Sequence, residues 1–396
     1  MKNRLLFDEI KKYTEHKNAL IITGMRQVGK TILMKSIFKH LGDKPKVWFD
    51  FDNPLDQKIF EDLEYKNIYK VLKDLSKARG DDRIFVFIDE IQNFPEATKV
   101  VKYLIDHYSV KFFITGSSSF YLKNLFPESL SGRKFLYELN PLSFREYLYF
   151  KGRISRERAS ELDISIAVKK KNIVEFKSFQ ADYNDYLQFG GFPEVVMTED
   201  MDTKKQVLKN IFASFFEKDL KIMSDYKDIR ELRDLILLLV PRVGSMMDVT
   251  KLASELGVDR PKIYSYLEFL QGTFFIKLLP KFSKSVDRAV ASGKKVYFSD
   301  TGILNIIGQV NDAQIFENAA INQLSNYEKV SFYNKKNTNE IDAILNKKIA
   351  FEIKTKGIPA DLIKLNKIIE KIGIKEGFII SKEYADFDRV VFPMFL

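Results

Sequence analysis

The sequence contains no cysteine, only three histidines and no long apolar run. The lack of cysteine excludes disulfides, zinc sites built on cysteine and thiol catalysis. The histidines, His16, His40 and His107, are far apart and show no spacing typical of metal ligands. The longest apolar run, Leu235 to Val240, is far shorter than the ~20 residues of a membrane span. The N-terminal segment MKNRLLFDEIKK lacks the apolar stretch of a signal peptide, so we expect a cytoplasmic protein with no membrane partner.

Length and charge set further limits. A chain of 396 residues is long enough for two to four domains. Its net charge of +10 favours an anionic partner, and nucleic acid is the first candidate. The alternative is a lysine-rich surface that only interacts with solvent, because the positive charge is spread along the chain.

The residue pattern predicts four consecutive segments of an α/β protein. Residues 1–140 alternate short apolar runs with helical patterns, which indicates βα units around a parallel sheet. Residues 141–224 are mostly helical, residues 225–289 have the pattern of a winged helix, and residues 290–396 return to α/β. The predicted strands of the first segment are Ala19–Thr23, Val47–Phe51, Ile84–Ile88 and Lys111–Thr115.

A complete GxxxxGK[ST] motif lies between the first predicted strand and the helix that follows it. Such a glycine-rich loop points its N–H groups at phosphates from the positive end of a helix. The lysine supplies a charge to the terminal phosphates, and the threonine hydroxyl binds magnesium. The residues expected to bind ATP are Gly24, Met25, Arg26, Gln27, Val28, Gly29, Lys30, Thr31 and Ile32.

Two carboxylates, Asp89 and Glu90, directly follow the predicted strand Ile84–Ile88. The carboxyl end of a buried parallel strand is where open α/β sheets bind ligands. We expect Asp89 to hold Mg²⁺ together with Thr31, and Glu90 to polarise the attacking water. Alone, the glycine-rich loop could be an ordinary turn, and the Asp-Glu pair could simply end a strand. Both motifs together, in this order, predict an ATP site.

Two further positions are candidates for sensing the γ-phosphate. A Ser-rich loop follows the strand Lys111–Thr115, and Ser117 is the first choice there, with Thr115 second. An ordinary turn is the alternative, because serine and glycine are common in turns. Arg133 lies in a later loop and is a candidate arginine finger for a neighbouring subunit; a solvated surface arginine is the alternative.

The segment 225–289 predicts two short helices, a strand and a basic hairpin, the order found in winged helices. Thr250 and Asp259 are the expected N-caps. Basic residues on the second helix and hairpin are candidates for contacts to nucleic acid. The alternative is a winged helix that packs on the ATPase core without contacting DNA. The candidates are Arg260, Lys262, Lys284 and Arg288, with Ser265 and Tyr266 on the same helix face and Lys281, Lys294 and Lys295 in the hairpin.

Acidic residues recur in the last segment. Asp342 and Glu352 lie on two predicted strands, Glu340–Leu345 and Ile349–Lys354, that can pair as a hairpin. Alternation along a strand places Glu352 and Lys354 on one face. With Glu317 from an upstream helix, three carboxylates and a lysine can hold Mg²⁺ and stabilise a transferred phosphate. A half-buried hairpin with solvated charges is the alternative.

Several blocks together resemble a family of predicted archaeal and bacterial AAA+ ATPases. The blocks are GMRQVGKT, IFVFIDEIQ, FFITGSSS, LSGRKFLYELNPLSFREYL and YLQFGGFPE. The resemblance implies an AAA+ or STAND-like core, a helical lid, a winged helix and a C-terminal restriction-endonuclease-like domain. It also implies a homo-oligomeric ring such as a hexamer, sensor 1 near Ser117 and a finger at Arg133. The last domain resembles the PD-(D/E)XK core at Glu317, Asp342, Glu352 and Lys354, although Asn339-Glu340 stands where a proline often precedes the aspartate.

The main hypothesis is an oligomeric ATPase that uses ATP and Mg²⁺ to remodel, translocate or cleave DNA. A second hypothesis is a STAND-like nucleotide switch with protein partners and an inactive nuclease-like domain. A simple DNA-binding regulator is the third, and the complete P-loop argues against it.

Overall fold

The computed structural model describes residues 2–116, 132–219, 226–283, 293–335 and 339–396. It forms two compact units. The first contains residues 1–140 and 272–274, and the second contains 141–271 and 275–396. In the described part of the chain, no helix combines the length and apolar character needed to cross a bilayer.

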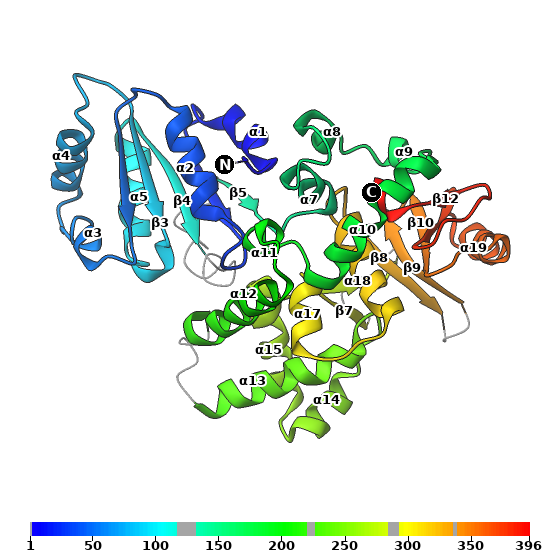
Figure 1. Ribbon diagram of the computed structural model, residues 1–396. Coiled ribbons are helices and arrows are strands. Elements are labelled where there is room, and N and C mark those ends of the chain that lie inside the picture. The colour runs from blue at the N-terminus through cyan, green and yellow to red at the C-terminus, as the bar shows by residue number, and fades with distance from the viewer. Residues whose placement is uncertain (1, 117–131, 220–225, 284–292, 336–338) are drawn as a thin grey trace. The chain divides into compact units, whose positions relative to one another are not determined.

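A five-stranded parallel sheet forms the centre of the first unit (Figure 1). Its strand order is β2-β3-β4-β1-β5. Three strands are buried along their whole length, as expected for apolar runs covered on both faces. The strands are β1 (Ala19–Thr23), β2 (Lys46–Asp50), β3 (Ile84–Asp89), β4 (Val110–Gly116) and β5 (Lys134–Glu138). The predicted P-loop core is therefore confirmed as a fold, and β5 is a strand that the sequence pattern did not predict.

Helices cover both faces of this sheet (Figure 1). One face packs against α4 and α5 through a cluster of buried aliphatic side chains that includes Ile68, Leu72 and Leu104. The opposite face packs against α2, whose Phe38 contacts Phe87 of β3 edge to face. The helices of this unit are α1 (Leu6–Ile10), α2 (Lys30–His40), α3 (Pro54–Lys58), α4 (Tyr65–Ser76) and α5 (Ala97–His107).

The second unit begins with helices. They are α7 (Phe144–Phe150), α8 (Arg156–Ser160), α9 (Ile164–Ala167), α10 (Ile173–Phe189), α11 (Pro193–Met197), α12 (Met201–Ser214), α13 (Tyr226–Leu239), α14 (Val249–Leu256) and α15 (Arg260–Gly272). The strands β6 (Ile276–Pro280) and β7 (Lys294–Phe298) then pair antiparallel. The order of α13 to β7 is the order predicted for a winged helix, and that assignment stays a prediction.

The N-caps in this region differ in part from the prediction. Asp248, not Thr250, caps α14, because its carboxylate accepts the Lys251 N–H at 3.0 Å while Thr250 already lies inside the helix. Asp259 does cap α15, by accepting the Lys262 N–H at 2.9 Å.

The Gly-Gly turn between α10 and α11 is held by a buried aspartate. Gly190 has φ +75°, which glycine adopts without strain. The Gly191 N–H donates to Asp300 at 2.7 Å, and the same carboxylate caps α17 (Thr301–Ile307) through Ile303. Burial raises the pKa of Asp300 to about 6, against three backbone N–H groups that lower it. The turn therefore joins α10 to α17, two helices far apart in the sequence.

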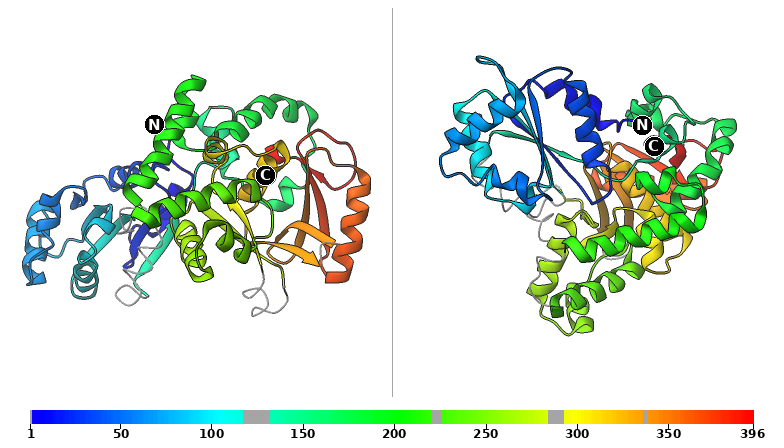
Figure 2. Two further views of the ribbon diagram at one scale, coloured as in Figure 1. Left: turned by 90° about the horizontal axis from the view of Figure 1, so that it is seen from below. Right: turned by 60° about the vertical axis from the view of Figure 1, so that its left-hand side comes forward.

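A mixed sheet forms the C-terminal part of the second unit, in the order β12-β11-β10-β9-β8. Strands β8, β9 and β10 are antiparallel neighbours, whereas β10, β11 and β12 are parallel. The helix α19 packs on one face through Leu365, Ile368 and Ile369, as the orange and red region of Figure 2 shows. The elements are α18 (Asp312–Leu324), β8 (Val330–Lys335), β9 (Asn339–Leu345), β10 (Ile349–Lys354), α19 (Pro359–Ile372), β11 (Glu376–Ser381) and β12 (Val390–Val391).

Candidate functional site

The glycine-rich loop connects β1 to α2 and has the backbone shape that its sequence requires. Gln27 and Gly29 have φ of +63° and +95°, so the chain turns sharply before the helix starts at Lys30. The Lys30 ammonium is buried and donates to the carbonyl oxygens of Gly24 and Met25 at 3.0 and 2.9 Å. The lysine thus lies across its own loop, at the N-terminus of α2, where a phosphate would be stabilised.

Arg4 secures this loop from outside the motif. Its guanidinium is buried and donates to the Val28 carbonyl at 2.7 Å and to the Asn140 carbonyl at 2.8 Å. It therefore ties the loop to the chain that follows β5. Nothing in the sequence indicates this role, because an arginine near a chain end looks like a surface residue.

Asp89 lies at the carboxyl end of β3 and is 4% exposed. The Thr115 hydroxyl, at the end of β4, donates to Asp89 Oδ1. Burial raises the pKa of Asp89, while hydrogen bonds from Thr115 and Thr31 oppose this shift. The structure therefore brings Thr31 and Asp89 together, and their hydroxyl and carboxylate oxygens are the ligand types that Mg²⁺ prefers.

Glu90 has a strained backbone, with φ +56° and ψ +51°. Its N–H donates to Thr115 Oγ1 at 3.0 Å, and its carboxylate accepts a hydrogen bond from the Gln92 side chain. A single hydroxyl thus holds Asp89 in place through its side chain and Glu90 through its backbone. From the sequence, Thr115 was only the second choice for a residue that senses the γ-phosphate. In the structure, its hydroxyl contacts both Asp89 and Glu90.

Replacing Thr115 by valine is expected to lower ATP turnover about 10- to 100-fold, because both bonds are lost without a change in side-chain shape. A buried group that loses its partner also costs about 1–3 kcal/mol of unfolding free energy. Steady-state phosphate release and thermal unfolding measure the two effects.

Thr115→Ser keeps the hydroxyl and is expected to restore most of the rate. Thr98→Val, at a buried threonine of α5, is the matched control. Equal losses in Thr115→Val and Thr115→Ser would show that the hydroxyl has no positioning role.

The two remaining candidates of the first unit are not placed at this site. Ser117 lies outside the described residues. Arg133 precedes β5, and its carbonyl accepts the N–H of Ala19 at the start of β1. Because the strands are parallel, Arg133 lies at their amino-terminal ends, whereas the glycine-rich loop lies at their carboxyl ends. Its guanidinium pairs with Asp106 at 2.5 Å, away from the glycine-rich loop of the same chain.

Comparison with known proteins agrees with this geometry. Residues 16–148 match the model of a family described as an AAA domain. Residues 16–148 are therefore similar to an AAA domain. Residues 180–314 and 313–394 match two families, each described as a domain of unknown function (DUF8612 and DUF4143).

Similar full-length proteins come from archaea and bacteria. An uncharacterised protein of Methanocaldococcus jannaschii, MJ1544, is 29% identical over 337 residues, which are 82% of this chain and 71% of that protein. An uncharacterised protein of Haemophilus influenzae is 27% identical over 353 residues, 84% of this chain and 82% of its own. The Walker-type ATPase PABY2304 of Pyrococcus abyssi aligns with TM-score 0.45 and 14% identity over 76% of this chain and 94% of that one.

The candidates for nucleic-acid contact on α15 separate into two groups. Arg260 is exposed, whereas the Lys262 ammonium is paired with Asp228 at 2.8 Å and Glu231 at 2.7 Å. Tyr266, expected on the exposed face, is 3% exposed and donates to Glu231 at 2.8 Å. Lys262 and Tyr266 therefore anchor α15 to α13. Lys284 and Arg288 lie outside the described residues.

The C-terminal carboxylates do come close to one another. Burial, followed by the neighbouring Asp342 carboxylate, raises the pKa of Glu317 and of Glu352 to about 7. Lys354 pairs with Glu352 at 2.8 Å, as the alternation of β10 predicted. Lys295 of β7 also lies here. It was expected from the sequence to contact phosphates from the hairpin, but it is buried and faces this cluster.

The carboxylates expected to bind a divalent metal lie close to a buried ammonium group. Among the described residues, no three His, Cys, Asp or Glu side chains form a group that could hold a metal ion. The Lys295 ammonium lies 3.5 Å from Glu317 and 3.9 Å from Asp342, the first two of the three expected ligands. The Mg²⁺ site expected at Glu317, Asp342 and Glu352 therefore stays a prediction, and the structure shows lysines among these carboxylates.

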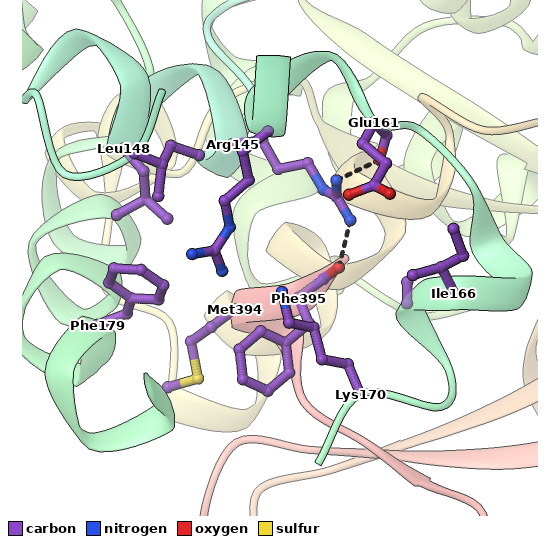
Figure 3. Close-up of a pocket in the computed structure, with 11 residues that line it drawn as sticks. Arg145, Leu148, Glu161, Ile166, Lys170, Phe179, Met394 and Phe395 are labelled. Atoms are coloured by element: carbon purple, nitrogen blue, oxygen red, sulfur yellow. Dashed lines mark hydrogen bonds between the residues drawn. The ribbon is translucent and has the colours of Figure 1, made fainter. Parts of the chain in front are cut away.

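A small cavity of about 20 Å³ in the second unit is also lined by basic side chains (Figure 3). Each of them has a partner within the chain. Arg145 donates to the Phe395 carbonyl at 2.6 Å, Arg158 pairs with Glu175, and Lys170 lies 3.5 Å from the same carboxylate. These bonds hold the C-terminal residues against α7 to α10, and the site has a structural role.

Proposed function

We propose that this protein is a Mg²⁺-dependent ATPase of the AAA type that acts on DNA. The observation that carries the ATPase part is the convergence of Thr31 and Thr115 on the buried Asp89, beside a loop whose lysine is buried at a helix N-terminus. Magnesium, when bound, would be held by Thr31 and Asp89 and would neutralise charge on the phosphates.

The remaining residues of the site have separate tasks in this proposal. Lys30 moves from the carbonyls of Gly24 and Met25 to the terminal phosphates of ATP. The backbone N–H groups of residues 24–32 bind the phosphate oxygens. Glu90 orients the attacking water and accepts its proton.

A lysine-lined cavity in the second unit supports DNA as the partner. The cavity has a volume of about 360 Å³ and lies between the β6–β7 hairpin and the edge strand β8. Within the described residues, none of its four ammonium groups forms an ion pair, in contrast to Lys262, Lys295 and Lys354. A polyanion such as the DNA backbone would neutralise this charge. The four residues are Lys281, Lys294, Lys329 and Lys347.

Other features fit the same proposal. Arg260 and Tyr264 of α15 are exposed, and Tyr264 is 60% exposed, as expected of a helix that contacts a groove. The resemblance to ring-forming ATPases suggests a homo-oligomer, in which Arg133 would leave Asp106 and reach the γ-phosphate of the next subunit.

Duplex DNA is expected to raise steady-state ATP hydrolysis several-fold at low salt and much less at moderate salt, because counterion release drives backbone contacts. Phosphate release is measured with duplex, single-stranded and branched DNA. Lys30→Ala is the background control and is expected to show no ATP hydrolysis with or without DNA. A rate that no DNA changes would contradict the DNA part of the proposal, and an unchanged rate in Lys30→Ala would contradict the ATPase part.

The lysine cavity has its own test. The double variant Lys329→Glu, Lys347→Glu is expected to weaken DNA binding at least tenfold and to leave the DNA-independent ATPase rate unchanged. The matched control is Lys177→Glu, Lys209→Glu, at exposed lysines of α10 and α12 that do not line the cavity. Fluorescence anisotropy of labelled duplex DNA over a salt series distinguishes the two variants.

A STAND-like nucleotide switch is the second candidate, and one contact favours it. Gln92 binds the Glu90 carboxylate, which would slow hydrolysis as long as the bond persists. This candidate predicts nucleotide that stays bound through purification, slow turnover and no response to DNA.

A further inference from the structure

We infer that the C-terminal carboxylate cluster takes its cation from within the chain, as the Lys295 ammonium, and does not bind a divalent metal ion. Lys295 lies on β7, which precedes all four positions that resemble a nuclease core (Glu317, Asp342, Glu352 and Lys354), and it is 3% exposed. Its ammonium lies 2.8 Å from Glu340 Oε1, 3.5 Å from Glu317 Oε1 and 3.9 Å from Asp342 Oδ1. This inference is independent of the proposed ATPase and DNA-binding activities.

One oxygen of Glu317 and one oxygen of Asp342 already accept hydrogen bonds from within the chain. Glu317 Oε1 accepts from the Tyr297 hydroxyl at 2.7 Å, and Asp342 Oδ2 accepts from the Ile353 N–H at 2.8 Å. Mg²⁺ requires oxygens at about 2.0–2.1 Å in near-octahedral geometry. An ammonium group instead interacts favourably with carboxylate oxygens at 2.8–3.9 Å, the N–O distances found here. The cluster therefore has the geometry of a lysine site.

The pairing of β6 with β7 fixes the side chain of Lys295 on the strand face that points to the carboxylate cluster. Pairing of β6 with β7 sets Lys295 opposite Leu279, and alternation directs Lys294 to the other face, where it lines the lysine cavity. A buried ammonium requires charged partners, and removing them leaves an uncompensated charge. Conversely, the carboxylates would repel one another without the lysine. The hairpin and the cluster therefore stabilise each other.

The test uses Mn²⁺ alone, without nucleotide, on the full chain. Electron paramagnetic resonance counts bound Mn²⁺ in the wild type, in Asp342→Asn and in Lys295→Met. We expect the wild type and Asp342→Asn to bind the same amount, because the cluster holds no metal. We expect Lys295→Met to gain a site, with affinity at least tenfold higher than any in the wild type. Lys294→Met, next to it on the opposite strand face, is expected to gain none.

Two results would overturn the inference. One is a Mn²⁺ site in the wild type that Asp342→Asn removes. Both proteins in this comparison keep Lys295. The other is a folded Lys295→Met protein that gains no Mn²⁺ site. If Lys295→Met fails to fold, Lys295→Arg keeps the charge and is expected to fold and exclude Mn²⁺ like the wild type, so the first comparison still decides.

Discussion

Replacing Glu90 by glutamine is expected to lower ATP turnover by about 10²- to 10⁴-fold while leaving ATP binding nearly unchanged. The substitution keeps the size of the side chain and its contact with Gln92 but removes the group that accepts a proton from water. Binding depends instead on the glycine-rich loop and Lys30, which the substitution does not touch. Phosphate release and binding of a fluorescent ATP analogue measure the two effects separately.

The control is Glu96→Gln, an exposed carboxylate before α5 in the same unit. It is expected to retain full turnover. Loss of ATP binding together with turnover in Glu90→Gln would indicate a damaged site and not a missing base. Full turnover in Glu90→Gln would show that another residue activates the water.

The candidate ATP site could be predicted from the sequence because each of its two motifs is a short local pattern. The glycine-rich loop directly follows β1, and the Asp89-Glu90 pair lies at the carboxyl end of β3, and both strands are buried throughout. Such strands are visible as short apolar runs. The strand β5 was not predicted, because it lies at the edge of the sheet and is half exposed; its Leu136 is 49% exposed. Its charged ends resemble a loop.

Contacts between distant segments could not be predicted in the same way. Arg4 binds a carbonyl 136 positions away, and no local pattern encodes such a contact. Lys295 and Lys262 were expected at a nucleic-acid surface because both are basic residues in a winged-helix pattern. Their neighbours across space are carboxylates of other elements, and only the packing of those elements shows that these lysines are paired.

The carboxylate cluster combines both cases. The spacing of Glu352 and Lys354 on one strand predicted their contact, because alternation along a strand is a local property. The same pattern could not show that β7 contributes a lysine. The acidic residues predicted to converge do lie close together, whereas one of the lysines among them, Lys295, comes from β7.

Replacing Gly190 by alanine is expected to destabilise the second unit by about 3–5 kcal/mol. A Cβ at this position would lie 2.1 Å from Asp300 Oδ1 and 2.3 Å from Oδ2, so the buried carboxylate must move. It would then lose the Gly191 and Ile303 N–H groups, and a buried charge without partners costs that much free energy. Differential scanning calorimetry and hydrogen exchange of α10 and α17 measure the loss.

Gly257→Ala serves as a control for a glycine with positive φ. Gly257 has φ +71° and ψ +30°, in the left-handed helical region, whereas Gly190 has φ +75° and ψ −161°, and a Cβ at Gly257 would meet no atom within 4 Å. Its alanine variant is expected to cost only the backbone strain, about 1–2 kcal/mol. The difference between the two variants therefore combines the contact with Asp300 and the greater backbone strain of alanine at Gly190. Equal costs would mean that Asp300 moves freely, and that this aspartate does not hold the turn between α10 and α11.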